Sequence, residues 1–302
     1  MLDWDRVDIN WEGRGADRGL RGIEFFDGHV YVAASDEIFV FDKSFSIVES
    51  YQNEYLKHCH EIDREENKLY LTSTGYDSIL EFDLKTEKFT KGFHLHFEPT
   101  SYALNRYTAK MDKAFNQYDN VLLGNKLIPR PKPTMDFFDP GKRNGPKQED
   151  SIHINNVSIK DGTIYVAGTG LGHLLALYGK KLRSFSRIPY NTHNATPIDK
   201  GVIANNTYTD GIISFDSNYN TISEFSIVRY AEEKLLNTDL PEDHARQAFG
   251  RGLVVTNDGL VIGGSSPATI SVYEFGRKEP IKTVNITMDI RNSIHGLELW
   301  PY

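Results

Sequence analysis

The sequence of 302 residues has a single cysteine, Cys59, so no disulfide bond can form within the chain. A chain without disulfides does not need an oxidising compartment. Its first residues lack the basic and apolar regions of a secretory signal peptide. No stretch approaches the ~18 consecutive apolar residues of a membrane span. We therefore predict a cytoplasmic protein with no membrane partner.

Positive charge is also scarce. Lys and Arg together number 34 against 42 Asp and Glu, which gives a formal net charge of −8. Because a phosphate backbone binds a basic face, this balance predicts no nucleic-acid partner. It leaves room for a small anionic molecule held by a few local arginines.

Short catalytic motifs are missing as well. The sequence has no Gly-x-Ser-x-Gly elbow, no P-loop and no Cys-x-x-Cys pair. Residues Gly168 to Gly172 resemble a dinucleotide-binding fingerprint, but no helix pattern follows them. We interpret that segment as a turn between two strands.

What the sequence does contain is a repeated β-hairpin. Residues Ser151–Thr169 show one copy, in which two runs rich in β-branched residues flank a Lys-Asp-Gly turn. Each copy continues into two further short strands, so the repeating unit has four strands and about 40 residues. The other copies begin at Arg21, His60, His193 and Arg251.

Repeats of this kind predict an all-β fold, a β-propeller formed by residues 1–302 as a single domain. We favour six four-stranded blades, with five or seven as alternatives. The sixth would combine the partial copy Ser293–Trp300 with N-terminal residues around Trp4 to Trp11, so that the two termini close the ring. Two sandwich domains are the competing interpretation, but they would not explain why every unit restarts with the same hairpin.

Two insertions interrupt the repeat. Residues 96–150 form a long segment that ends in proline-rich irregular loop, and residues 231–249 carry a predicted short helix, Ala231 to Leu236, with a second turn after Pro241. Both connect the outer strand of one unit to the inner strand of the next. We therefore expect both to cover one mouth of the propeller axis as a lid.

A ring of polar residues is predicted at that mouth. Counting back ten residues from a fixed point on the second strand of each unit gives a His, an Arg or an Asn near the start of the inner strand. In the third unit His153 lies two residues before the counted Asn155, on the same side of the strand. The predicted ring is Arg21, His60, Asn155 with His153, His193, Arg251 and His295.

The four histidines of the ring predict a metal site. Imidazoles that converge from separate strands are typical ligands of Fe, Mn or Zn, so His60, His153 and His193 with His295 form the predicted ligand set. A structural role is the alternative, because propeller repeats often keep a polar residue near the inner strand for hydrogen bonds between blades.

The arginines predict an anionic ligand, since a guanidinium binds carboxylate or phosphate and keeps its charge. Arg21, Asn155, Arg251 and Arg246 are the predicted substrate-binding residues. Salt bridges to a neighbouring strand, for example to Glu24 or Glu298, are the alternative for Arg21 and Arg251. The predicted supporting residues, which orient the others, are His58 and His244.

Three segments carry a resemblance to a known family. They are His153-Ile-Asn155-Asn-Val, Thr192-His193-Asn-Ala-Thr-Pro and Arg251-Gly-Leu-Val-Val. In this order they resemble a bacterial family of propeller-like proteins of unassigned function, over residues 150–290 approximately. The resemblance implies a propeller and no particular substrate. The predicted axial arrangement of four histidines resembles that of the carotenoid cleavage oxygenases, which hold iron in this way. This resemblance concerns the arrangement and not the sequence.

Three hypotheses of function follow. The first is a metal-dependent enzyme, an oxidoreductase or lyase, that acts on a small anionic substrate under the lid. The second is a propeller that binds a ligand or protein without catalysis. The third is a lyase or hydrolase that acts on an acidic sugar with His and Arg and no metal.

Overall fold

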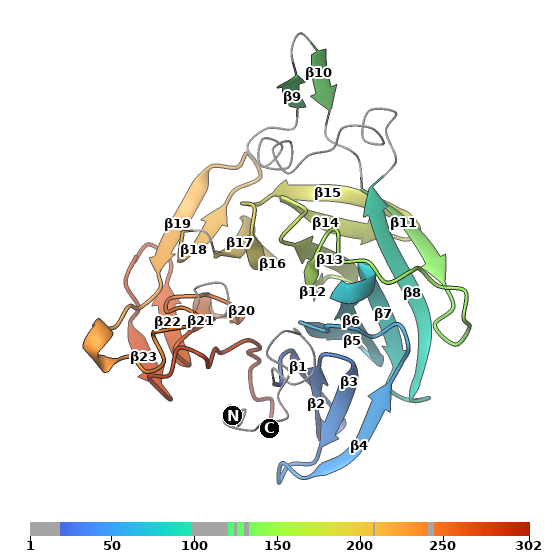
Figure 1. Ribbon diagram of the computed structural model, residues 1–302, viewed down its shortest axis with the longest axis horizontal. Helices are drawn as coiled ribbons and strands as arrows, with labels where there is room; N and C mark the ends of the chain where they lie inside the picture. The colour runs from blue at the N-terminus through green and yellow to red at the C-terminus, as the bar shows by residue number, and fades with distance from the viewer. Residues whose placement is uncertain (1–18, 98–119, 124–125, 130–132, 208, 241–244) are drawn as a thin grey trace.

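Five antiparallel sheets stand in a ring around a common axis in the computed structural model (Figure 1). The structure describes residues 19–97, 120–123, 126–129, 133–207, 209–240 and 245–302. The prediction of an all-β propeller is confirmed. No helix in these ranges is long and apolar enough to cross a membrane.

Each sheet runs in chain order from an inner strand at the axis to an outer strand at the rim. The strands of blade 1 are β1 (Ile23–Phe26), β2 (His29–Ala34), β3 (Glu37–Phe41) and β4 (Ile47–Gln52). Those of blade 2 are β5 (Ile62–Glu65), β6 (Lys68–Ser73), β7 (Ser78–Asp83), β8 (Lys88–Phe97) and β11 (Pro133–Phe138). Those of blade 3 are β12 (Ile154–Lys160), β13 (Thr163–Gly168), β14 (His173–Tyr178) and β15 (Lys181–Arg187). Those of blade 4 are β16 (Thr192–Ile198), β17 (Gly201–Asn206), β18 (Gly211–Phe215) and β19 (Thr221–Ser226). Those of blade 5 are β20 (Leu253–Val255), β21 (Leu260–Ser265), β22 (Thr269–Glu274) and β23 (Lys282–Asn285).

Turn chemistry fixes the register of the innermost hairpins. Asp27 and Gly28 both have positive φ, 47° and 77°, and so do Asp161 and Gly162, 49° and 71°. Two successive positive φ values are what a two-residue hairpin turn needs, and Asp-Gly supplies them at little cost. Because the turn length sets the pairing, these two hairpins pair in the same register next to the turn, Phe26 with His29 and Lys160 with Thr163.

The core lies between neighbouring blades rather than at the axis. Leu69 and Leu71 of β6 and Leu80 of β7 are fully buried against Ile38 of β3, so blades 1 and 2 share one apolar cluster. The middle strands are buried on both faces for this reason, whereas β4 at the rim is largely exposed. Apolar packing therefore holds the blades together and leaves the inner edges free for polar residues.

The prediction of six blades was wrong, since the described residues form five, the lower of the two alternatives. Residues Ser293–Trp300 form no strand. They have no second strand to pair with, and their main chain bonds to the neighbouring blade instead. Gly252 N donates to Ile294 O at 3.0 Å and Ile294 N donates to Ser265 O at 3.3 Å. At its other end the Trp300 ring lies 5.3 Å from the Phe25 ring of β1, so this segment bridges blade 5 to blade 1. The N-terminal residues proposed to complete a sixth blade lie outside the described residues.

The first insertion is more regular than predicted. Its β11 adds a fifth strand to blade 2 by pairing with β8, and Pro133 stands at the start of that edge strand, where a missing N–H is tolerated. The two-stranded hairpin of β9 (Asn120–Leu123) and β10 (Lys126–Pro129) projects outward from the ring in Figure 1. These parts of the insertion do not cover the axis, and residues 98–119 lie outside the described residues.

The second insertion has a 3-10 turn, η3 (Glu232–Lys234), in place of the predicted helix Ala231 to Leu236. The helix does not continue because Leu236 N donates to Met288 O at 3.1 Å, which ties the chain to blade 5. The turn predicted after Pro241 lies outside the described residues. One further 3-10 turn, η2 (Thr74–Tyr76), joins β6 to β7.

Candidate functional site: a ring of histidine and arginine at the axis

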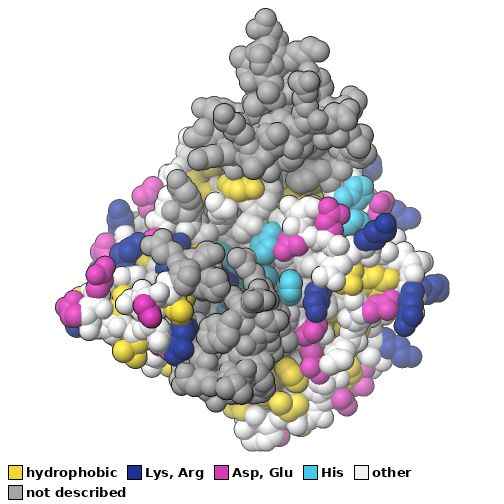
Figure 2. Space-filling model, viewed as in Figure 1, with side chains coloured by type: hydrophobic (Ala, Val, Ile, Leu, Met, Phe, Trp, Pro, Cys, Tyr) yellow, Lys and Arg dark blue, Asp and Glu magenta, His cyan; other side chains and the backbone are white. Residues whose placement is uncertain are grey.

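The predicted ring residues lie at the starts of the inner strands. Arg21, His60 and Arg251 each precede their inner strand by two residues, and His193 lies on β16. The main chain links neighbouring members directly, since Gly22 N donates to His60 O at 3.1 Å. His295 comes from the bridging C-terminal segment, so six segments contribute to one mouth. Figure 2 shows histidine side chains near the centre of this face.

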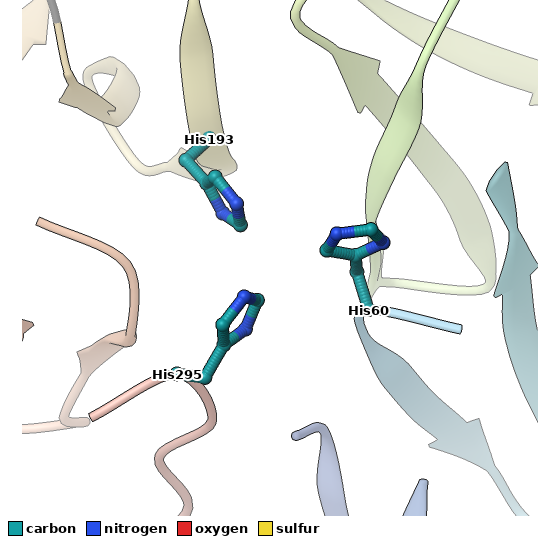
Figure 3. A group of neighbouring side chains, drawn as sticks. All are labelled: His60, His193 and His295. Carbon is teal, nitrogen blue, oxygen red and sulfur yellow. The ribbon is translucent and has the colours of Figure 1, made fainter. Parts of the chain in front are cut away.

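Three of the histidines converge on one point (Figure 3). One ring nitrogen of each of His60, His193 and His295 lies within 4.8 Å of those of the other two. The ring centroids of His193 and His295 are 4.9 Å apart, and His60 lies 5.7 and 5.4 Å from them. His60 and His193 are only 7% and 4% exposed. The three imidazoles therefore share a largely dry environment.

Hydrogen bonds fix the tautomer of these imidazoles. His60 Nδ1 lies 2.7 Å from His58 O, which as a carbonyl only accepts, so Nδ1 carries the proton. His193 Nδ1 lies 3.1 Å from Asn194 Oδ1, whose amide is oriented by Nδ2 donating to Glu61 Oε2 at 3.1 Å. In both residues the Nε2 lone pair is left for a partner at the axis.

Arg251 supplies that partner for two of the rings. Its Nη1 donates to His295 Nε2 at 2.6 Å and lies 3.4 Å from His193 Nε2. The Arg251 guanidinium also lies over the Phe249 ring, 4.3 Å from its centroid, and Arg246 lies 4.7 Å from it. A permanent cation thus already stands against the lone pairs that a metal would use.

The electrostatics favour neutral histidines. Burial holds the pKa of His60, His193 and His295 well below the usual range, and the charges of Arg21 and Arg251 lower it further. Arg21 is only 6% exposed, and its Nη1 donates to Cys59 O at 3.3 Å. At neutral pH the ring therefore combines two fixed positive charges with three uncharged imidazoles.

His153 lies beside His60, but its ring nitrogen is engaged elsewhere. Its ring lies 5.5 Å from that of His60, but its Nδ1 lies 2.9 Å from Asp150 Oδ1, and its backbone φ is 55°. A β-bulge between Ile154 and Asn156 shifts the register at this point. The His153 side chain therefore faces Asp150. The ring nitrogens that converge are those of the other three histidines.

Asn155 is fully buried, and neither its Oδ1 nor its Nδ2 has a hydrogen-bond partner among the described residues. His295 Nδ1 is in the same situation. Leaving a buried polar group unsatisfied costs about 1–3 kcal/mol. These unsatisfied atoms of Asn155 and His295 lie near Arg and His side chains. A site that binds a polar ligand has such atoms.

The remaining predicted residues lie further out. Arg246 Nη1 pairs with Asp210 Oδ1 at 2.5 Å and its Nη2 donates to Thr207 O at 2.6 Å, so it reaches the ring only through Phe249. His58 acts on His60 through its main-chain oxygen rather than its ring. His244 lies outside the described residues.

Sequence reasoning missed three residues of the site: Asn194, Glu61 and Phe249. Asn194 and Glu61 each follow a ring histidine directly, so the offset that located the ring would have located them as well. Phe249 lies two residues before Arg251, and no spacing signal distinguishes it from a core aromatic.

A group of acidic side chains lies just beyond the ring. Burial raises the pKa of Glu24 to about 7, and the nearby charges of Asp63 and Glu298 raise it further. Burial likewise raises the pKa of Asp63 to about 7. Glu24 Oε1 lies 3.7 Å from Arg64 Nε.

We expect Glu24→Gln to stabilise the protein at alkaline pH. A carboxyl whose pKa is higher in the folded state favours folding while protonated, and that contribution is lost as the pH rises from about 4.5 to about 7. Between pH 5 and pH 8 the free energy of unfolding of the variant should therefore rise by about 2 kcal/mol relative to the wild type. Urea unfolding at both pH values measures this. Glu49→Gln, at an exposed position of β4, is the control, and an equal effect of the two substitutions would contradict the prediction.

No protein-family model matches the sequence, and no curated protein is significantly similar to it. Among solved structures, the chain is similar to virginiamycin B lyase from Staphylococcus aureus, with a TM-score of 0.44 and 10% identity over 86% of this chain and 71% of that chain. It is also similar to Hsv2 from Kluyveromyces lactis, with a TM-score of 0.44 and 12% identity over 89% and 83%. A protein of unknown function from Bacteroides caccae gives a TM-score of 0.48 and 10% identity over 85% and 73%.

At these identities the neighbours define no activity for this chain, and the propeller is defined by the chain's own five sheets. Membership of the bacterial family that the three segments resemble stays a prediction. So does the cytoplasmic location.

Proposed function

We propose that the protein binds a small anionic molecule at the axial ring and acts on it as a metal-independent lyase. The observation that supports this most is the contact of Arg251 with His295 and His193. A guanidinium holds the lone pairs that a metal would need, and a second guanidinium, that of Arg21, is buried at the same mouth. Two fixed cations attract an anion and oppose a divalent cation.

The anion itself would expose the base. A charge-assisted bond between a guanidinium and a carboxylate is stronger than one between a guanidinium and a neutral imidazole. A bound carboxylate therefore draws Arg251 away from His295 and leaves the Nε2 lone pair of His295 free. Because the imidazole is neutral, it is ready to accept a proton.

The reaction that fits these groups is elimination next to the carboxylate. His295 Nε2 takes the proton from the carbon beside the carboxylate, and the arginines stabilise the negative charge that develops on its oxygens. The electron pair of the broken C–H bond forms a C=C bond as the leaving oxygen departs from the next carbon. The imidazolium then returns the proton to that oxygen, so no external oxidant or metal is consumed. An acidic sugar has both the carboxylate and the leaving oxygen.

The test is an assay on a panel of uronic-acid oligosaccharides in the presence of a chelator, with ultraviolet detection of the new conjugated C=C bond. We expect activity that the chelator does not remove and that His295→Gln lowers at least about 100-fold. His29→Gln, a histidine on β2 outside the ring, is the matched control and should retain activity. Anion binding without turnover on any member of the panel would instead support the non-catalytic binding propeller.

A metal centre remains the second candidate because three imidazole nitrogens lie within 4.8 Å of one another. His60, His193 and His295 would hold Fe, Mn or Zn once Arg251 moved aside, and the metal would act there as a Lewis acid or redox centre. Activity that a chelator abolishes and one of these metals restores would favour this candidate over the lyase.

A further inference from the structure

Three positions beyond the ring lies a second set of six residues, five of which are polar. A strand rises about 3.3 Å per residue, so this set lies ~10 Å further along the strands, toward the opposite face. Its acidic members come from blades 1 and 2 and from the bridging segment. The six positions are Glu24, Asp63, Ser158, Thr196, Val254 and Glu298.

A cavity of about 1070 Å³ begins at this second set. Asp63, Ser158 and Glu298 line its axial end together with Glu61. From there it extends between blades 4 and 5, where its mixed walls include the apolar residues Leu253, Val255, Ile222 and Phe275. The cavity therefore has an acidic inner end and partly apolar walls. No Arg or His of the ring lines it, but Glu61 and Asn194, which support His193, do.

The carboxyl groups at the inner end accept hydrogen bonds from main-chain and side-chain amides. Asp63 Oδ2 accepts from Ile159 N at 2.6 Å, Glu298 Oε1 accepts from Leu299 N at 2.7 Å, and Glu61 Oε2 accepts from Asn194 at 3.1 Å. The basic residues that line the cavity are Lys160 and Lys200, and Lys160 is paired with the exposed Asp199 at 2.7 Å. Arg64 is the charged neighbour of Asp63, but it is already paired with Glu24 at 3.7 Å. Burying several carboxylates with so little positive charge is costly, so a further cationic group at this end would be favoured.

Ser158 gives an independent indication of a ligand. It is only 8% exposed and lines the cavity, yet its Oγ has no hydrogen-bond partner among the described residues. A hydroxyl both donates and accepts, and a buried one is normally satisfied. A polar ligand atom at the acidic end of the cavity would complete its bonding.

We propose that this cavity binds an organic cation, a molecule with an ammonium or guanidinium group on an apolar body. The cationic group lies between Glu61, Asp63 and Glu298 and bonds to Ser158 Oγ, and the apolar body lies between blades 4 and 5. A bare divalent ion uses the carboxylates but not the apolar walls, and it fills a small part of the volume.

The experiment compares n-hexylamine with n-hexanol, which share the apolar chain and differ in the head group. Binding to the wild-type protein is measured by calorimetry and by NMR. We expect hexylamine to bind at least about tenfold tighter than hexanol, and Glu298→Gln and Ser158→Ala each to weaken the amine and leave the alcohol unchanged. Glu233→Gln, an exposed substitution on η3, is the control.

Equal binding of amine and alcohol would overturn the proposal in favour of a merely apolar cleft. Calcium that binds at the carboxylates and displaces hexylamine would overturn it in favour of a metal site, and failure of both probes to bind would overturn it altogether. The comparison of the two probes uses the wild-type protein, so it holds even if a variant fails to fold.

Discussion

Replacing Arg251 with methionine is expected to weaken the binding of small anions about 100-fold and to strengthen the binding of zinc at least about tenfold. Methionine keeps much of the length and apolar contact of arginine but removes the charge. A charge-assisted hydrogen bond contributes about 1.5–3 kcal/mol, and each 1.4 kcal/mol is a factor of ten in affinity. Losing the guanidinium therefore accounts for the loss of anion affinity.

The gain in zinc affinity has the same origin. Arg251 Nη1 lies 2.6 Å from His295 Nε2 and 3.4 Å from His193 Nε2, so it competes for the lone pairs and repels a divalent ion. In the variant the three imidazoles are released from this competition. Calorimetric titration of chelator-treated protein with phosphate and with zinc measures both effects.

Arg277→Met is the matched control, because Arg277 is an exposed residue paired with Glu274 at 3.6 Å, in the connection between the outer strands β22 and β23 of blade 5. It should leave both affinities unchanged. If the Arg251→Met protein binds phosphate as tightly as the wild type and gains no affinity for zinc, Arg251 does not have the role given to it here.

Replacing Gly296 with alanine is expected to lower the free energy of unfolding by about 3 kcal/mol. A Cβ atom at Gly296 would lie 2.1 Å from Arg21 O, a main-chain atom that cannot rotate away. This contact joins the bridging C-terminal segment to the start of blade 1. The substitution therefore forces blade 1 and the segment apart and displaces His295 from the ring.

The loss is measured by urea unfolding, and phosphate binding by the surviving folded protein reports the displacement of His295. Gly211→Ala is the control, because the nearest atom to its added Cβ would lie at an ordinary 3.5 Å. A Gly296→Ala protein that is as stable as the wild type and binds phosphate equally well would show that the bridging segment does not hold the ring closed.

Much of the ring was predictable because hairpin geometry is local. A short hairpin turn, Asp-Gly in blades 1 and 3, joins the two inner strands of a blade, so counting ten residues back from the second strand reaches a similar point near the axis. The offset located His60 and His193, which the structure brings to one mouth. It located His153 less well, because the bulge at Ile154 and the positive φ of His153 are not visible in a spacing count.

The features that the sequence did not reveal depend on long-range contacts. The number of blades depended on whether Ser293–Trp300 would find a strand partner, and its main chain bonds to blade 5 instead. The contact of Arg251 with His295 depends on where that same segment crosses, 44 residues later in the chain. The metal prediction rested on the presence of the histidines. The Arg251 guanidinium beside them makes an anion the ligand that we favour.

The most direct test of the anion site is an NMR titration of the ring histidines in chelator-treated wild-type protein. The imidazole C–H signals of His60, His193 and His295 are followed while phosphate is added to one sample and zinc to another. Binding of an anion at the two arginines predicts that phosphate shifts all three signals together and that equimolar zinc leaves them in place. Signals that move with equimolar zinc and ignore phosphate would contradict the anion site and establish a metal centre in its place.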